Sequence, residues 1–413
     1  VAVSSRFTLL PCMSMSHRAI LYLLSWTATV CAGISATLFS VYLPAIAARL
    51  FGQATPEAIA HVGSWGGASF LLGWTLGGIA LGAAGDRLGR KAAFIVSIVA
   101  CSAGMAITAL ASSMPPFLIS RMITGAGAGG ILLVTAVMVS EAWVVGNRAR
   151  VVGILINAFP MGFVVVGAIH AAVEGVQTAF FMGSSSVVLA AVAAVVVKES
   201  DLWKRHRSAE DSKSAPNHLE HHRRDVLVGI LLFGSMLVGL WAAYTWMPAW
   251  VSSISLPADA KSNRAFTIAL LGLGAVVGGI VSGGASNRWG RRPAAAAGYV
   301  GAAIVSWLVF TASMQPGPML WVLTFMLSFF IGYNQGVLTG YLPELFPTMV
   351  RGLAVGLCFN AGRLITTVTV FFVGVLVASL GGYDRAILAF TAAYLVGLVT
   401  LLAARETRGQ ALQ

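Results

Sequence analysis

Residues 82–91 read Gly-Ala-Ala-Gly-Asp-Arg-Leu-Gly-Arg-Lys, and the pattern returns at residues 283–292 as Gly-Gly-Ala-Ser-Asn-Arg-Trp-Gly-Arg-Arg. Each copy follows a long apolar run. A second match joins Glu141 and Arg148 to Glu344 and Arg351, with equal spacing inside the two pairs. Both matches are offset by nearly the same number of residues. We therefore expect two related halves, one following the other along the chain.

The composition indicates that these halves lie in lipid. Of the 413 residues, 58% are hydrophobic and 10% are charged, whereas soluble domains carry about 25% charged residues. A membrane-spanning helix needs about 20 consecutive apolar residues. Breaks between the apolar runs predict twelve spans, at 20–48, 61–85, 91–112, 116–141, 149–172, 178–197, 226–254, 264–287, 293–313, 318–341, 352–379 and 383–403.

The expected fold is an all-α membrane protein whose twelve transmembrane helices form two pseudo-symmetric six-helix bundles. The charged segment from Lys198 to Asp225 separates the bundles as a solvated linker. Repeated six-helix halves place a binding site at their interface, near the middle of the bilayer. The expected divisions are an N-terminal tail, a first bundle, a linker, a second bundle and a C-terminal tail, at 1–19, 20–197, 198–225, 226–403 and 404–413.

The net charge of +12 follows from the membrane topology. Most Lys and Arg residues lie in the tails, in the linker and in loops on the same side of the membrane. Because cytoplasmic loops are enriched in Lys and Arg, we expect a multi-pass protein of a bacterial cell inner membrane with both termini in the cytoplasm. The opposite loops hold few basic residues, namely Arg49, Lys261, Arg264 and Arg385.

Several other classes of function find no support in the sequence. The positive charge needs no nucleic acid to explain it, because topology accounts for it. The four cysteines lack the spacing of a metal site or a disulfide framework. No serine or cysteine nucleophile motif stands beside a base, so an enzyme is not indicated. We expect no cofactor and no bound metal.

The motifs resemble those of the major facilitator superfamily. The resemblance rests on G-x-x-x-D-R-x-G-R-K between the second and third spans, on its echo between the eighth and ninth, and on Pro-Glu-Leu-Phe-Pro-Thr-x-x-Arg at residues 343–351. It covers essentially all twelve helices. Glu344 to Arg351, followed by Gly356, Asn360 and Arg363, is similar to the branch of organic-anion and organic-cation transporters, niacin and sialate or lactate symporters, and sugar porters.

The resemblance implies a gate at the cytoplasmic side. There a buried Asp86 would bind the N-terminal end of the eleventh span in the other half, and break this contact when the carrier opens inward. Similar pairs would join acids and arginines of the repeated motifs. The alternative is that these charges only anchor the topology. The expected gate residues are Asp86, Arg87, Arg90, Glu141, Arg148, Arg288, Arg291, Glu344 and Arg351.

The strongest candidate for binding substrate is Arg363. It lies 11 residues after Gly352, where the eleventh span begins, and a helix rises 1.5 Å per residue, which places it near mid-membrane. A charge there is costly unless it faces water or a partner, and all 14 acids lie in loops or near helix ends. The planar guanidinium suits a carboxylate. The alternative is a structural arginine bound to backbone carbonyls.

Polar and aromatic residues at similar depth would shape the rest of the site. Three adjacent polar residues in the tenth span need partners or water, and aromatic rings of the seventh span could stack on a substrate. Ordinary packing or an interfacial belt is the alternative for the aromatic residues. The expected site residues are Asn360, its repeat mate Asn157, Tyr333, Asn334, Gln335, Tyr244 and Trp246.

Candidates for proton coupling are fewer. The resemblance associates Arg121, in the fourth span, with proton coupling or with helix packing, and packing is favoured here. His170 with Glu174 could form a proton site, since histidine titrates near neutrality; the alternative is a pair without a role. We expect proton-coupled symport of a small organic acid, a monocarboxylate or an aromatic or sialate-like carboxylate, by a functional monomer in the lipid bilayer.

Other functions stay open at this point. A sugar or neutral-solute porter, a facilitator or anion exchanger without proton coupling, a drug exporter and a membrane sensor that does not transport are the alternatives. The first is distinguished by tolerance of Arg363→Lys, and the last by ligand binding without counterflow.

Overall fold

The computed structural model describes residues 15–143, 148–200, 203, 220, 222–312 and 314–408, and within them every regular element is a helix. The first half contains α1 (Met15–Phe51), α2 (Pro56–Leu88), α3 (Arg90–Leu110), α4 (Met114–Ala142), α5 (Arg148–Ile156), α6 (Ala158–Ala172), α7 (Val176–Ser184) and α8 (Val187–Val196). The second contains α10 (Arg223–Ser253), α11 (Ala260–Trp289), α12 (Arg291–Thr311), α13 (Pro318–Tyr341), the 3-10 turn η2 (Leu342–Leu345), α14 (Thr348–Leu380), α15 (Tyr383–Thr391) and α16 (Ala393–Ala403).

Twelve of these helices or helix pairs are long and apolar enough to cross a membrane, which confirms the expected all-α fold. Several begin or end beyond the apolar runs. The first span starts at Met15 instead of residue 20, and α2 extends to Leu88 instead of residue 85, because helices continue into the polar boundary region. Most of the expected linker and parts of both tails lie outside the described residues.

Three spans are interrupted in the middle. The fifth span divides into α5 and α6 at Asn157, where Pro160 lacks the N–H that would bond the carbonyl of Ile156. The sixth divides at Ser185 and Ser186, and the twelfth at Ala392. Two other turns require glycine. Gly89 between α2 and α3 has φ +107°, and Gly290 between α11 and α12 has φ +98°, a backbone region that other residues rarely adopt. These are the turns of the repeated motif.

Glycines let the helices inside each half approach closely. A side chain at Gly125 of α4 would collide with the carbonyl of Phe70 in α2, and one at Gly73 would collide with Met122. In the second half, Gly278 of α11 meets the backbone of Phe329 in α13. Helices inside lipid have no hydrophobic driving force for association, and the close packing that small residues allow at such crossings holds them together instead.

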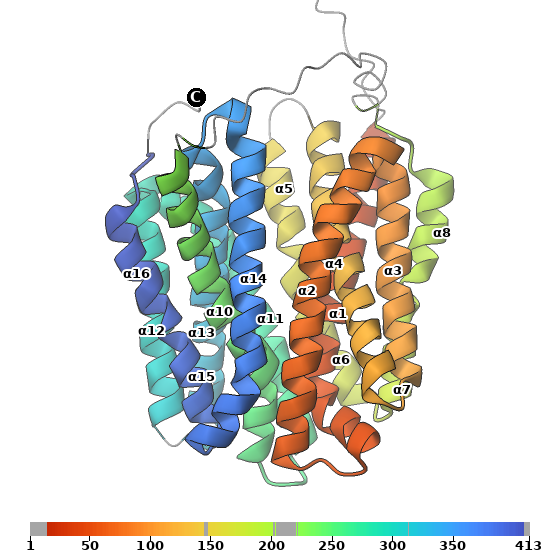
Figure 1. The fold of residues 1–413 in the computed structure, drawn as a ribbon, viewed down its shortest axis with the longest axis vertical. Helices are drawn as coiled ribbons and strands as arrows, with labels where there is room; N and C mark the ends of the chain where they lie inside the picture. The colour runs from red at the N-terminus through yellow and green to blue at the C-terminus, as the bar shows by residue number, and fades with distance from the viewer. Residues whose placement is uncertain are drawn as a thin grey trace, which may run out of the picture.

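The two halves meet along α2 with α14 and α6 with α11. We call the end of the molecule where α8 and α16 end and α10 begins the linker side, and the other end the far side (Figure 1). On the far side, Trp246 of α10 fills the space above Gly63 of α2, and the rings of Trp65 and Phe371 lie 4.7 Å apart.

The linker side is arranged differently. There α14 and α2 diverge in the ribbon (Figure 1), and a side chain added at Gly352 or Gly356 of α14 would meet nothing. The same holds at Gly153 of α5 and Gly283 of α11. The halves are therefore closed together on the far side and separated on the linker side.

The crossing of α2 and α4 provides a test of this packing. We expect Gly125→Ala to destabilise the protein by about 1–3 kcal/mol, the usual cost of overpacking, because the new methyl group meets the Phe70 carbonyl. The matched control is Gly153→Ala, which has free space in the structure. Thermal unfolding in detergent measures both, and equal melting temperatures for the two variants would contradict the tight crossing.

Candidate functional site

Arg363 lies in the middle of α14, where the two halves meet. Its Nη1 donates a long hydrogen bond of 3.4 Å to Oδ1 of Asn360 on the same helix. Its guanidinium carbon lies 5.4 Å from the ring centre of Trp74, which belongs to α2 in the other half. Among the described residues, no acidic side chain forms an ion pair with it. The mid-membrane charge thus has an amide and an aromatic face as neighbours, with no carboxylate.

Trp74 belongs to an aromatic cluster that we define as Phe70, Trp74, Phe159 and Trp241. The ring centres lie 5.6 Å apart for Phe70 and Trp74, 5.4 Å for Trp74 and Phe159, and 5.9 Å for Trp74 and Trp241. The four residues come from α2, α6 and α10, and so from both halves. Sequence reasoning did not single them out. The available signal was depth, because Trp74 and Trp241 lie well inside their spans, away from the interfacial belt.

The two asparagines of the repeat have matching positions. Asn157 donates to the carbonyl of Gly153 over 3.2 Å, and Asn360 donates to that of Gly356 over 3.0 Å. Three residues later the copies differ, since the first half has Pro160 where the second has Arg363. The first half therefore has a helix break beside Pro160 where the second half has the charge of Arg363. This difference explains why the site has one such arginine and not two.

The three polar residues of α13 point in different directions. Asn334 faces α12, where it would collide with a side chain at Gly298, so it lies inside the second half. Tyr333 is buried and stacks on Phe329, with ring centres 6.2 Å apart. Gln335 is half-buried. The structure does not bring Asn334 or Tyr333 into contact with Arg363.

The two candidates on α10 separate as well. The ring of Tyr244 lies 5.0 Å from Phe163 in the other half, and its hydroxyl shares a 3.0 Å hydrogen bond with Ser328. Trp246 is fully buried against Gly63. Tyr244 thus extends the aromatic contact between the halves, whereas Trp246 belongs to the closed far side and not to the surroundings of Arg363.

The proton-coupling candidates lie away from Arg363. Arg121 is 1% exposed and sits over the rings of Phe39 and Phe70, at 4.6 and 4.5 Å. It donates a 3.4 Å hydrogen bond to the carbonyl of Ser35. These contacts, cation–π interactions in a desolvated core, describe a residue that packs the first half.

His170 and Glu174 do not form the expected pair. His170 is buried, with its ring centre 4.6 Å from that of Tyr42. Glu174 is 90% exposed at the side chain and pairs with Lys261 of the second half, at 3.6 Å. One residue faces inward from α6 and the other follows the end of that helix, so their sequence proximity does not join their side chains.

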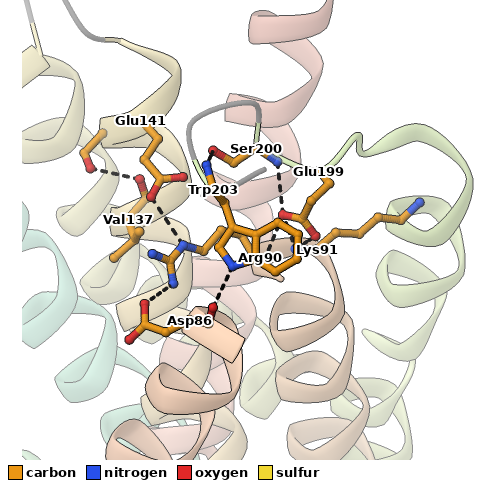
Figure 2. Close-up of polar contacts among 9 residues, drawn as sticks. Asp86, Arg90, Lys91, Val137, Glu141, Glu199, Ser200 and Trp203 are labelled. Carbon is orange, nitrogen blue, oxygen red and sulfur yellow. Dashed lines mark hydrogen bonds and ion pairs between the residues drawn. The ribbon is translucent and has the colours of Figure 1, made fainter. Parts of the chain in front are cut away.

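The linker side of the first half is organised around Arg90 at the start of α3 (Figure 2). Arg90 pairs with Asp86 at 2.5 Å and with Glu141 of α4 at 3.3 Å. All three residues belong to one half, and the side chain of Asp86 is 69% exposed. Asp86 does not contact the eleventh span here and is paired with Arg90, one turn away in the same half. The expected gate contact belongs to a state closed on the linker side, whereas the halves are separated there in this structure, so the gate stays a prediction.

The second half repeats the arrangement around Arg291. Its guanidinium binds Glu344 through two hydrogen bonds of 2.9 and 2.7 Å and reaches Oδ1 of Asn287 over 3.0 Å. The other arginines of the motif have different surroundings in the described part of the chain. Arg351 donates to the carbonyls of Pro343 and Phe346, Arg87 and Arg288 are exposed, and the side chain of Arg148 lies outside the described part.

A third repeated feature, a glutamate after the last helix of each half, was not predicted from the sequence. Glu199, after α8, accepts the backbone N–H groups of Arg90 and Lys91 at the start of α3. Glu406, after α16, accepts those of Arg291 and Arg292 over 2.9 and 3.0 Å. Helix N-termini attract carboxylates. The signal was Lys-Glu-Ser at 198–200 and Arg-Glu-Thr at 405–407, each following the last helix of its half.

These contacts change the acidity of Glu406. Burial alone would raise the pKa of this carboxyl group, but four backbone N–H groups, including those of Arg291 and Arg292, bind its charged form and hold the pKa below the ordinary value of 4.5. The Glu406 carboxylate joins the end of α16, the last helix of the second half, to the start of α12. Glu406 therefore ties the second half together on the linker side, as Glu199 does for the first half.

The Glu406 contact predicts how stability depends on pH. A carboxyl group with a lowered folded pKa stabilises the protein above its unfolded pKa, near 4.5, and loses this contribution as pH falls through the folded value. We expect Glu406→Gln to have a lower melting temperature than the wild type at pH 7. At strongly acidic pH the melting temperatures of the two proteins should approach each other. The exposed Arg288→Gln is the control. An equal difference at both pH values would contradict the assignment.

The comparisons with known proteins agree with this geometry. The Major Facilitator Superfamily model matches residues 25–365. The cis,cis-muconate transport protein of Acinetobacter baylyi is 27% identical and aligns over 94% of both chains. The niacin transporter NiaP of the same organism is 25% identical, over 83% of this chain and 85% of its own. The inward-open structure of the xylose transporter XylE from E. coli has a TM-score of 0.76 and 18% identity, over 96% and 98%. The chain belongs to the Major Facilitator Superfamily.

Proposed function

We propose that the protein transports a small organic acid across the membrane and that Arg363 binds the substrate carboxylate. The observation that carries this proposal is a guanidinium at mid-membrane, between the halves, that forms no ion pair within the described residues. An intramembrane charge needs a partner. The negatively charged partner of Arg363 would then be the carboxylate of the substrate, which arrives and leaves during each cycle.

The neighbours of Arg363 support this role. Asn360 contacts the guanidinium through Oδ1 and so orients its planar fork, which can hold a carboxylate through two parallel hydrogen bonds. Trp74 presents an aromatic face next to it. The relatives named for cis,cis-muconate and for niacin carry molecules that combine a carboxylate with a flat conjugated frame. A substrate of that kind fits an arginine beside a tryptophan.

The transport cycle would move the two halves as bodies. Taking the linker side as the cytoplasmic side, the far-side contact of Trp246 with Gly63 closes the outer path. The Arg90 and Arg291 clusters bind residues of their own half, so they would keep each bundle rigid during the motion. The far-side ion pair of Glu174 and Lys261 joins the halves and would break when the carrier opens outward.

We propose further that the protein acts as a monomer in the bacterial cell inner membrane, with both termini in the cytoplasm and uptake coupled to protons. The support for proton coupling is the resemblance of the sequence motifs to a branch that includes symporters. An anion exchanger or facilitator is the second candidate, favoured by the position of all 14 acids in loops or near helix ends. A sugar or neutral-solute porter is the third; the XylE likeness, at 18% identity, supports the shared fold alone.

Counterflow tests the role of Arg363. In proteoliposomes loaded with unlabelled cis,cis-muconate or nicotinate, we expect the wild type to accumulate the labelled acid. Arg363→Lys should lower this counterflow roughly tenfold or more, because an ammonium cannot form the bidentate contact. Arg223→Lys, at the start of α10, is the matched control, because the Arg223 side chain is 77% exposed and is not one of the expected gate residues. Counterflow of xylose that survives Arg363→Lys would support the neutral-solute porter instead.

A proton gradient separates symport from exchange. We expect uptake of the labelled acid to rise when the proteoliposomes are acidic outside and neutral inside, because the proton supplies the driving force. The measurement compares initial rates with and without the gradient, at one external pH and with an uncoupler as control. Equal rates would reject symport and leave exchange or facilitated diffusion.

A further inference from the structure

The empty carrier poses a problem that the loaded carrier does not have. Once the acid has left, Arg363 stays at mid-membrane and must pass through the closed intermediate without its anion. No acid among the described residues forms an ion pair with it, and the sequence places the 14 acids in expected loops or near expected helix ends. A charged group without water or a partner at that depth is strongly disfavoured. A carrier that returns empty therefore needs another group to stabilise the guanidinium.

The structure places an aromatic ring where it can serve as such a group. The guanidinium carbon lies 5.4 Å from the ring centre of Trp74, inside the range of about 6 Å for a cation–π interaction, and Trp is the best of the aromatic partners. The ring is 5% exposed. Phe70, Phe159 and Trp241 pack around it, so the aromatic face is held in place and needs no rearrangement to receive the cation.

The pair also lies between the closed part and the open part of the contact between α2 and α14. Toward the far side, α2 and α14 are in contact at Gly67 with Val370 and at Trp65 with Phe371. Toward the linker side, Gly352 and Gly356 of α14 have free space. Trp74 and Arg363 lie between the closed and the open parts of this helix pair. A contact at the pivot of a rocking motion can be kept while the ends open and close.

We propose that Trp74 is the resting partner of Arg363 and that this contact lets the unloaded carrier return. Trp74 is a positioning residue for transport. This inference rests on the proposed function. The substrate carboxylate and the aromatic face of Trp74 are alternative partners of one guanidinium. Because the empty protein can close around its arginine, it performs net transport instead of being confined to the exchange of one acid for another.

Two assays with the same vesicles separate the two modes. Net uptake of labelled cis,cis-muconate into vesicles without internal acid requires the empty carrier to return, whereas counterflow into vesicles loaded with unlabelled muconate does not. We expect Trp74→Leu, which keeps apolar bulk and removes the aromatic face, to lower net uptake roughly tenfold more than counterflow. Trp74→Phe keeps an aromatic face and should keep the wild-type ratio of the two rates.

The matched control is Trp241→Leu. Trp241 packs edge-on against Trp74 in the same cluster but has no contact with Arg363 among the described residues, so the ratio of net uptake to counterflow should stay at the wild-type value. Size-exclusion profiles in detergent verify that each variant is folded. Nicotinate serves as a second labelled acid if muconate is carried slowly.

Several results would overturn the inference. If Trp74→Leu lowers net uptake and counterflow by the same factor, or leaves both unchanged, Trp74 has no special role in the empty carrier. If Trp241→Leu reproduces the selective loss of net uptake, packing of the cluster and not its face toward Arg363 is responsible. Failure of the proposed function has a different signature, since the wild type itself would then show no counterflow of either acid.

Discussion

One positive charge held at mid-depth between two helical bundles is the constraint on which this protein depends. Arg363 is half-buried in the middle of α14 and has no carboxylate partner among the described residues, so its stabilisation depends on what occupies the interface. Asn360 orients the guanidinium through a long hydrogen bond, and Trp74 of the opposite half offers an aromatic face. In the proposed function, a charge whose partner comes from the other half or from the substrate would couple binding to the relative position of the halves.

In the proposed transport cycle the interface between the halves is the part that moves, and the distribution of contacts supports this. Inside each half, glycine crossings bring helices to backbone contact, and on the linker side Arg90 and Arg291 gather acids of their own half. Glu199 and Glu406 attach the last helices of the halves to the starts of α3 and α12. Strong polar contacts thus lie within bundles. The contacts between bundles on the far side are mainly apolar, with one exposed ion pair between Glu174 and Lys261, and these can separate at lower cost.

The candidate site was partly predictable from the sequence. Depth along a span and the lack of acids at that depth identified Arg363, and the repeat identified Asn360 and Asn157. The facing residues were not predictable in the same way. Trp74 and Trp241 gain their significance from a contact between halves that no local pattern reports. Trp246 and Asn334, chosen for chemistry and depth, turned out to face the closed far side and the interior of the second half.

The sequence by itself determined the twelve spans, the duplication of the chain and the placement of charges on one side, because apolar length, repeated turns and loop charge are local properties. Only the tertiary structure decided which face of each helix meets which neighbour, where Asp86 finds its partner and what lies against Arg363. The physical reason is that helices in lipid are apolar on most faces, so hydrophobic periodicity is weak. Their orientation is instead chosen by close packing of small residues and by a few polar contacts.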